Sequence, residues 1–206
     1  MLNLAAQAHR ERRDFLETLG ASQGSPLGMI AWAEGGAPYA DPANALAPVA
    51  VEGLYECVRY LCNARLGESD DARALAMNIL QQLGDRCAVI GEREGVRLAL
   101  VANEDARAST RLATIDGGEF PKSLASVFEP SDDAAALSYA TGVSVPASAE
   151  IRPFERARLD GAWSECLHAH APTALSIPRG GMSADSLADF LRKLYRDETC
   201  RGVRFM

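Results

Sequence analysis

The sequence predicts an α+β fold, in which about six or seven helices pack on a mostly antiparallel sheet. Its predicted centre is a three-strand meander, because three apolar runs at 86–91, 95–103 and 107–116 are separated by the short polar stretches EREG and NEDA. No internal repeat or low-complexity linker divides the chain. We therefore expect residues 1–206 to form a single globular domain.

The composition supports a globular protein and argues against several classes of partner. Of the 206 residues, 48% are hydrophobic and 24% are charged, which is enough apolar material for a core. A net charge of −7 without long basic runs argues against nucleic acid and membrane surfaces as partners. The N-terminus lacks the order of a signal peptide, and no apolar stretch reaches the roughly 18 residues of a membrane span. We expect a cytoplasmic protein, with signal-peptide-independent secretion as the alternative.

The basic and sulfur-containing residues add two expectations. Only Lys122 and Lys193 are lysines among the 21 basic residues, and this arginine bias indicates a GC-rich coding sequence and a bacterial source. The five cysteines form no CxxC pair and no His/Cys cluster with zinc spacing. We therefore predict reduced thiols and no metal site. No motif in the sequence points to a cofactor.

Two peripheral segments precede the predicted core. Residues 3–19 place apolar side chains on one helical stripe and Gly20 is a natural stop, which predicts a peripheral N-terminal helix. Residues 20–48 are rich in glycine, proline and alanine, and form a predicted loop region. One apolar run within it, Leu27 to Ala33, has the length of a strand.

A helical hairpin is predicted before the meander. Its first helix covers residues 49–66 and opens after Pro48. Ser69 caps the second helix, which is expected to end at Gly84. The predicted buried face of this second helix comprises Leu75, Ile79, Leu80 and Leu83.

Short helices and strands are predicted after the meander. Helices are expected near 120–128 and 131–141, a longer helix opens at Pro153, and Ser183 caps another. The predicted strands of this segment are GVSVP, TALSIP and RGVRFM.

Cys57, in GLYECVRYLC, suggests a cysteine nucleophile, for which His168 or His170 of CLHAH is the candidate base. An activated thiol commonly sits at a helix N-terminus. A helix that starts after Pro48 instead places Cys57 about two turns inside, which predicts a packed core thiol. The catalytic interpretation returns if the helix begins near Tyr55.

The pair His168 and His170 also resembles a metal site. Residues two apart on a helix point about 200° away from each other, so the two imidazoles cannot bind one ion there. The apolar periodicity of the segment favours a helix, and we therefore predict no metal at this pair.

Two joints between predicted elements are candidate anion-binding loops. In SIPRGGMSADS, a strand, two glycines and a serine-capped helix direct free N–H groups towards an anion, and an arginine adds positive charge. TIDGGEFPKSL offers a similar joint with a lysine. Both also read as ordinary strand-to-helix joints, because neither contains a P-loop or a dinucleotide-binding pattern. The candidate residues are Arg179, Gly180, Gly181, Ser183, Gly117, Gly118 and Lys122.

The element order strand, helix, helix, three-strand meander, helix, strand, helix, strand resembles the acyl-CoA N-acetyltransferase fold. This resemblance implies an acyl-CoA-dependent N-acyltransferase with residues 117–124 as its pyrophosphate loop, although the family pattern Q/R-x-x-G-x-G/A is absent there. Since no acid, base and nucleophile converge, the main expectation is binding of a partner protein or a small-molecule ligand. The acyltransferase, and a hydrolase or deamidase that uses Cys57, are the alternatives.

Overall fold

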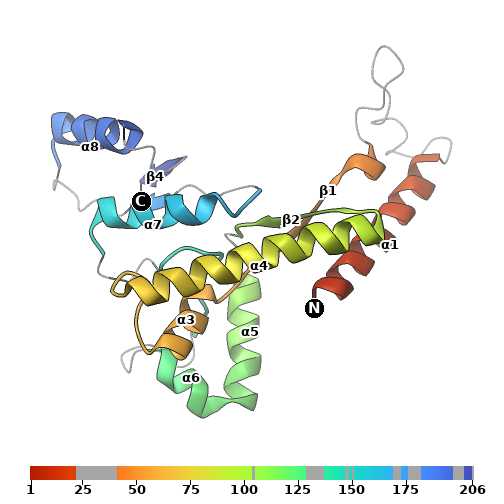
Figure 1. The fold of residues 1–206 in the computed structure, drawn as a ribbon, viewed down its shortest axis with the longest axis horizontal. Coiled ribbons are helices and arrows are strands. Elements are labelled where there is room, and N and C mark those ends of the chain that lie inside the picture. The colour runs from red at the N-terminus through yellow and green to blue at the C-terminus, as the bar shows by residue number, and fades with distance from the viewer. Residues whose placement is uncertain are drawn as a thin grey trace. The chain divides into compact units, whose positions relative to one another are not determined.

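The described part of the chain folds mostly into helices and contains two small two-stranded sheets (Figure 1). The structure, a computed structural model, describes residues 1–21, 41–103, 105–128, 137–146, 149, 151–168, 173–175, 182–196 and 202–205. The elements in chain order are α1 (Leu2–Ala21), the 3-10 helix η1 (Pro42–Asn44), β1 (Leu46–Ala50), α3 (Leu54–Cys62), α4 (Asp70–Glu94), β2 (Arg97–Val101), α5 (Ala106–Glu119), α6 (Pro121–Val127), α7 (Pro153–Ser164), β3 (Thr173–Leu175), α8 (Ala184–Arg196) and β4 (Val203–Phe205).

The predicted antiparallel meander is wrong, and with it the α+β class built on that sheet. Residues 86–91 belong to α4, which continues through Gly84 to Glu94, and residues 107–116 belong to α5. Only the middle run contains a strand, β2, and it pairs with β1. Short apolar runs fit a buried strand and a helix face equally well, so periodicity alone did not separate the two.

The spacing of buried residues and a helix cap explain why the runs 86–91 and 107–116 are helical. The buried residues of α4 recur at helical spacing, at Ala72, Ala76, Leu80, Cys87 and Ile90. The stretch NEDA is a helix start and not a hairpin turn, because the carboxylate of Asp105 accepts the Arg107 N–H at 3.0 Å. Ser109 and Ala113, four residues apart, then form the buried side of α5.

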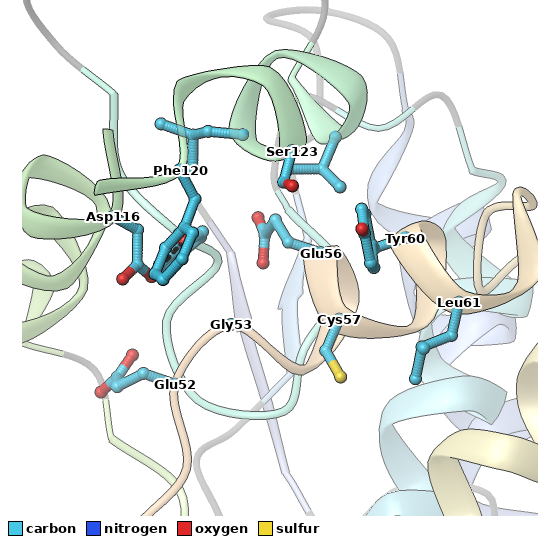
Figure 2. A pocket seen from close by; sticks show the side chains of 12 residues that line it. Glu52, Gly53, Glu56, Cys57, Tyr60, Leu61, Asp116, Phe120 and Ser123 are labelled. Carbon is cyan, nitrogen blue, oxygen red and sulfur yellow. Dashed lines mark hydrogen bonds between the residues drawn. The ribbon is translucent and has the colours of Figure 1, made fainter. Parts of the chain in front are cut away.

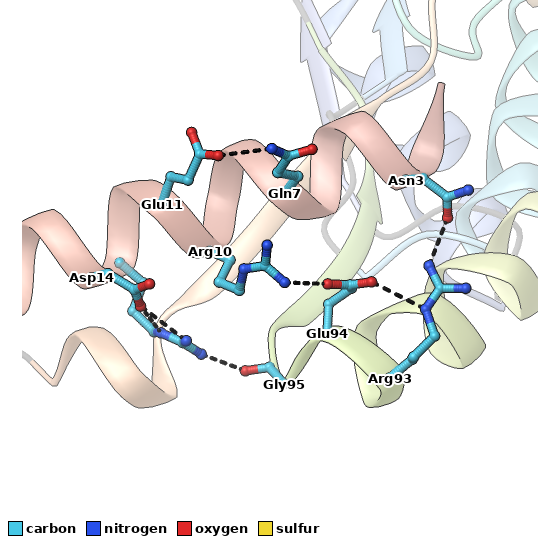
Figure 3. A network of polar contacts seen from close by, with 9 residues as sticks. Asn3, Gln7, Arg10, Glu11, Asp14, Arg93, Glu94 and Gly95 are labelled. Atoms are coloured by element: carbon cyan, nitrogen blue, oxygen red, sulfur yellow. Dashed lines mark hydrogen bonds and ion pairs between the residues drawn. The ribbon is translucent and has the colours of Figure 1, made fainter.

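The contact pattern divides the chain into two compact units, Met1–Val49 with Gln82–Leu100, and Ala50–Gln81 with Val101–Met206. In the first unit, Ala6, Ile90 and Val96 form a small core. Three polar contacts hold α1 to the end of α4 in this unit (Figure 3). They are Arg10 to Glu94 at 2.5 Å, Arg13 to the Gly95 carbonyl at 2.6 Å and Arg93 to Asn3 at 2.9 Å.

The second unit contains α3, α5 to α8 and the parallel pair of β3 and β4. Thr173 pairs with Val203 and Leu175 with Phe205, and α8 lies between the two strands in the chain. Helix α6 packs against both α3 and α5. These three helices build the site described below.

Several predicted elements are confirmed. Helix α1 agrees with the predicted N-terminal helix, although its buried residue is Ala6 and Phe15 is exposed. Helices α6 and α7 begin at the predicted prolines, and the terminal strands β3 and β4 are present. Ser69 and Ser183 cap their helices, since their hydroxyls accept the N–H groups of Ala72 and Ser186.

Four other predictions have different outcomes. Pro48 lies in β1, so the first hairpin helix begins only at Leu54. GVSVP forms turns and bends instead of a strand. Of the predicted helix 131–141, residues 137–140 are not helical and 131–136 lie outside the described residues, as does the predicted strand Leu27 to Ala33. None of the described helices is both long and apolar enough to span a membrane.

Candidate functional site

A cavity of about 500 Å³ lies in the second unit (Figure 2). It is bounded by the start of α3, by the corner between α5 and α6, and by Tyr139 from the segment 137–146. The residues that line it are Glu52, Gly53, Glu56, Cys57, Tyr60, Leu61, Asp116, Phe120, Ser123, Leu124, Val127 and Tyr139. This volume is typical of a site for a small molecule.

The chain turns at Gly53, which lines the cavity. This residue has a φ of 71°, a left-handed conformation that favours glycine, and α3 starts immediately after it. A Cβ atom here would lie 3.3 Å from Cγ of Tyr139. The Gly53 N–H donates to the Ala140 carbonyl at 3.2 Å, which holds the segment 137–146 against the start of α3.

Two glutamates, one on each side of this turn, bind the same segment. Glu52 accepts hydrogen bonds from Nδ2 of Asn103 at 2.5 Å and from the Gly142 N–H at 3.2 Å. Glu56 accepts the Ala140 N–H at 2.8 Å through Oε1. Its other oxygen, Oε2, is buried and has no hydrogen-bond partner among the described residues. Burial raises the pKa of the Glu56 carboxyl.

Asp116, near the end of α5, places a third carboxylate in the cavity. The Tyr139 hydroxyl donates to its Oδ2 at 2.6 Å. The Tyr139 ring also stacks on Phe128, with ring centroids 5.9 Å apart. Burial, followed by the hydrogen bond to Asp116, raises the pKa of Tyr139, so its hydroxyl stays protonated and remains a donor.

The rim of the cavity is apolar and open. Tyr60, Leu61 and Phe120 are 56%, 61% and 57% exposed. In Figure 2, Glu56 lies in the middle of the view, with Tyr60 on one side and Asp116 on the other. The twelve lining residues include three carboxyl groups and neither lysine nor arginine. The cavity therefore suits a ligand with hydroxyl groups and a flat apolar part, and it repels anions.

Cys57 lies on the wall of this cavity, and the expectation of a packed core thiol does not fit its surroundings. The helix begins at Leu54, so Cys57 stands in its first turn, and the residue is exposed. Partial burial of the thiol, and then the neighbouring Cys62 and Glu56, raise its pKa. Cys57 is therefore mostly a neutral thiol at pH 7.

Of the two histidines predicted as a base for Cys57, the structure describes only His168. His168 is exposed, lies after the end of α7, and is not among the residues that line the cavity. His170 lies outside the described residues. Among the described residues, no group of three His, Cys, Asp or Glu side chains is arranged to hold a metal ion.

The two predicted anion loops have different settings. Gly117 and Gly118 lie in the last turn of α5, not in a loop after a strand, and Lys122 is the second residue of α6. Ser183 is the N-cap of α8. Arg179, Gly180 and Gly181 lie outside the described residues. Anion binding at these residues stays a prediction.

The sequence patterns did not point to Glu52, Glu56, Asp116 and Tyr139 as site residues. One signal was available, because EGLYE places two carboxylates on either side of a glycine that can turn the chain. The partners from the rest of the chain had no such signal. Asp116 and Tyr139 reach the cavity, and Asn103 reaches Glu52, only through tertiary packing, across sequence separations that periodicity does not describe.

Solved structures of the anaerobic ribonucleotide reductase from Thermotoga maritima are similar to this chain. The complex with dATP and CTP matches with a TM-score of 0.72 and 15% identity, covering 96% of this chain and 30% of that one. The form with citrate in the active site matches with a TM-score of 0.66 and 16% identity, and the match covers 98% of this chain and 36% of that one. The form with glycerol in the active site matches with a TM-score of 0.67 and 16% identity, and the match covers 97% of this chain and 32% of that one. This chain thus spans about a third of their length.

No sequence match was found among curated proteins. A family model described as anaerobic ribonucleoside-triphosphate reductase, in contrast, matches residues 1–205. This match corrects the sequence-based functions. The prediction of an acyltransferase is wrong, and its fold required the meander. The prediction of a hydrolase or deamidase that uses Cys57 is wrong as well, and so is the main expectation of a binding protein without an identified reaction. Because the model covers nearly every residue, the chain belongs to the anaerobic ribonucleoside-triphosphate reductase family.

Proposed function

We propose that this chain binds a ribonucleotide as part of a reaction of the ribonucleotide reductase type, and that the cavity beside α3 takes the nucleoside end. The observation that carries the proposal is the lining of the cavity, where three carboxyl groups and three aromatic rings face one space. Family membership supplies the class of ligand. A cytoplasmic location is part of the same proposal, because ribonucleotides are abundant there.

The ligands of the similar structures support this choice. The Thermotoga maritima enzyme was solved with dATP and CTP, and with glycerol in its active site. A nucleoside combines a ribose, whose hydroxyl groups donate to carboxylates, with a flat base that stacks on aromatic rings. Tyr60 and Phe120, exposed at the rim, are the rings that a base can reach in this chain.

The charge of the cavity sets the direction of the bound nucleotide. The carboxylates of Glu52 and Asp116 line it and none of the lining residues is a lysine or an arginine, so a triphosphate inside it would be repelled. We infer that the ribose and the base enter and that the phosphates point to solvent.

Calorimetric titration tests the proposal with adenosine, cytidine, ATP and CTP. We expect each nucleoside to bind at least as tightly as its triphosphate, because the phosphates add repulsion and no contact. Tyr60→Ala and Phe120→Ala should each weaken binding by about tenfold through lost stacking. Tyr195→Ala is the matched control, since this tyrosine of α8 is 85% exposed and is not part of the lining.

Two results would overturn the proposal. One is the absence of binding heat for all four compounds at millimolar concentration. The other is binding that Tyr60→Ala, Phe120→Ala and Tyr195→Ala leave equally unchanged, which would place the nucleotide elsewhere on the chain.

A further inference from the structure

The two oxygens of Glu56 have different surroundings. Oε1 accepts the Ala140 N–H at 2.8 Å, and because a backbone N–H only donates, this oxygen must act as an acceptor. Oε2 is buried with no partner among the described residues, and the whole residue is only 6% exposed. If Glu56 carries a proton, the proton is therefore on Oε2.

Burial favours that proton. An ionised oxygen that is removed from water and has no donor is costly, whereas a neutral acid is much less so. Desolvation is the largest influence on the Glu56 pKa and raises it, and Glu52 adds to the rise. The backbone N–H groups of Ala140 and of Glu56 itself, and then Arg59, act in the opposite direction and are outweighed.

The elements around Glu56 supply both signs of charge. The residues 52–60 around Glu56 in the chain include Glu52, Cys57, Arg59 and Tyr60. Helix α5 supplies Asp116, and the segment 137–146 supplies Tyr139. The side chains that α6 adds to the lining are Ser123, Leu124 and Val127, which do not ionise. Among these described neighbours Arg59 is the cation, and its charge lowers the Glu56 pKa.

We propose that Glu56 recognises its ligand as a neutral carboxylic acid that donates a hydrogen bond from Oε2 to a ligand oxygen. The carboxylates of Glu52 and Asp116 accept hydrogen bonds from other groups of the same ligand. A compound with several uncharged hydroxyl groups meets both demands, because a hydroxyl group donates and accepts. This inference rests on the proposed function, in which that compound is the ribose part of a nucleotide.

The protonation of Glu56 is tested first without any ligand. The infrared difference spectrum between the wild type and Glu56→Gln at pH 7 should show the carbonyl stretch of one neutral carboxylic acid. Since the difference isolates Glu56, other carboxyls such as Asp160 do not contribute. Glu52→Gln serves as the control and should leave the band in place. A spectrum with only the carboxylate bands of Glu56 would overturn the proposal.

Ligand recognition is tested next with adenosine. Glutamine keeps an acceptor for the Ala140 N–H and an N–H donor in place of the Oε2 proton. We therefore expect Glu56→Gln to bind within about threefold of the wild type, and Glu56→Met, which has no donor, to lose at least tenfold. Wild-type affinity should fall as the pH is raised and Glu56 ionises, while that of Glu56→Gln stays flat. Urea melts of each variant confirm that it is folded.

Failure of this inference differs from failure of the proposed function. Equal losses in Glu56→Gln and Glu56→Met would mean that the ligand binds an ionised Glu56, which overturns the inference and leaves nucleoside binding intact. If adenosine does not bind at all, the proposed function fails, and glycerol, an uncharged polyol, replaces it in the same comparison. Absence of glycerol binding as well would overturn the inference.

Discussion

The hydroxyl of Tyr139 donates a 2.6 Å hydrogen bond to Asp116, which joins the segment 137–146 to the end of α5. The same ring stacks on Phe128 and lies over Gly53. Tyr139 thus contacts three parts of the chain that are far apart in sequence. Its contacts add to those of Glu52 and Glu56 in holding the segment 137–146 against the cavity.

Tyr139→Phe should lower the free energy of unfolding by about 1 to 2 kcal/mol, because the ring stays while Asp116 loses its donor. Urea denaturation followed by circular dichroism measures the change. Tyr195→Phe is the control and should change stability by less than about 0.5 kcal/mol, since Tyr195 is 85% exposed. Equal stabilities of the two variants would show that the hydrogen bond to Asp116 contributes nothing.

Gly53→Ala should destabilise the chain by about 1 to 2 kcal/mol, since alanine is strained at a φ of 71°. The new Cβ would also press on the Tyr139 ring at 3.3 Å. Gly84→Ala, inside α4 with nothing within 4 Å of its Cβ position, should instead stabilise by about 0.5 to 1 kcal/mol. Urea melts compare the two. A loss of stability in Gly84→Ala would contradict a helix that continues through Gly84 and would support the helix end that the sequence predicted there.

The sequence predicted elements well where a cap or a proline marks a helix start. Pro121 and Pro153 are the first residues of α6 and α7, and Ser69 and Ser183 cap α4 and α8. These signals act through the backbone of the next few residues, so they do not depend on the rest of the fold.

The sequence failed where long-range packing decides the outcome. The cap of the run at 107–116, Asp105, is a local signal, but the burial of Ser109 and Ala113 comes from tertiary packing, and burial of such small residues is not visible in a hydrophobic run. The site was missed for the same reason. The sequence suggested Cys57 as a nucleophile, whereas the chemical character of the cavity comes from the preceding residue, Glu56. The burial of Glu56 requires the hydrogen bond from Ala140, which lies 84 residues away in the chain.

Leu80→Ala should cost about 2 to 5 kcal/mol of unfolding free energy, because Leu80 is fully buried on α4 and its truncation leaves a cavity. The sequence placed this residue on the buried face correctly, although the meander expected to cover it is absent. Val89→Ala on the same helix is the control, with an expected change within about 0.5 kcal/mol, since Val89 is exposed. Similar midpoints for the two variants in urea would contradict the assigned face.

Asp160, on α7, is hydrogen-bonded to β3 and to the segment 137–146 in the second unit, and its carboxyl group is buried. Hydrogen bonds from Thr173, Ser144 and the Val145 backbone favour its ionised form, but burial outweighs them and raises its pKa from 3.8 to about 6. Its Oδ1 is buried and has no hydrogen-bond partner among the described residues. The folded state therefore holds a proton on Asp160 more tightly than the unfolded state does.

The pH dependence of stability follows from that difference. Above pH 6 the folded chain carries the buried charge, and as the pH falls from about 7 towards 4, protonation of the folded state adds stability. Lowering the pH from 7.5 to 5 should thus raise the contribution of Asp160 by about 1 kcal/mol. Glu56, whose pKa burial also raises, acts in the same direction, so the wild type alone does not isolate Asp160. Asp160→Asn does, and its unfolding free energy should gain about 1 kcal/mol less than that of the wild type over this interval. Parallel pH profiles of the two proteins in urea melts would show that the carboxyl of Asp160 titrates normally in the folded chain.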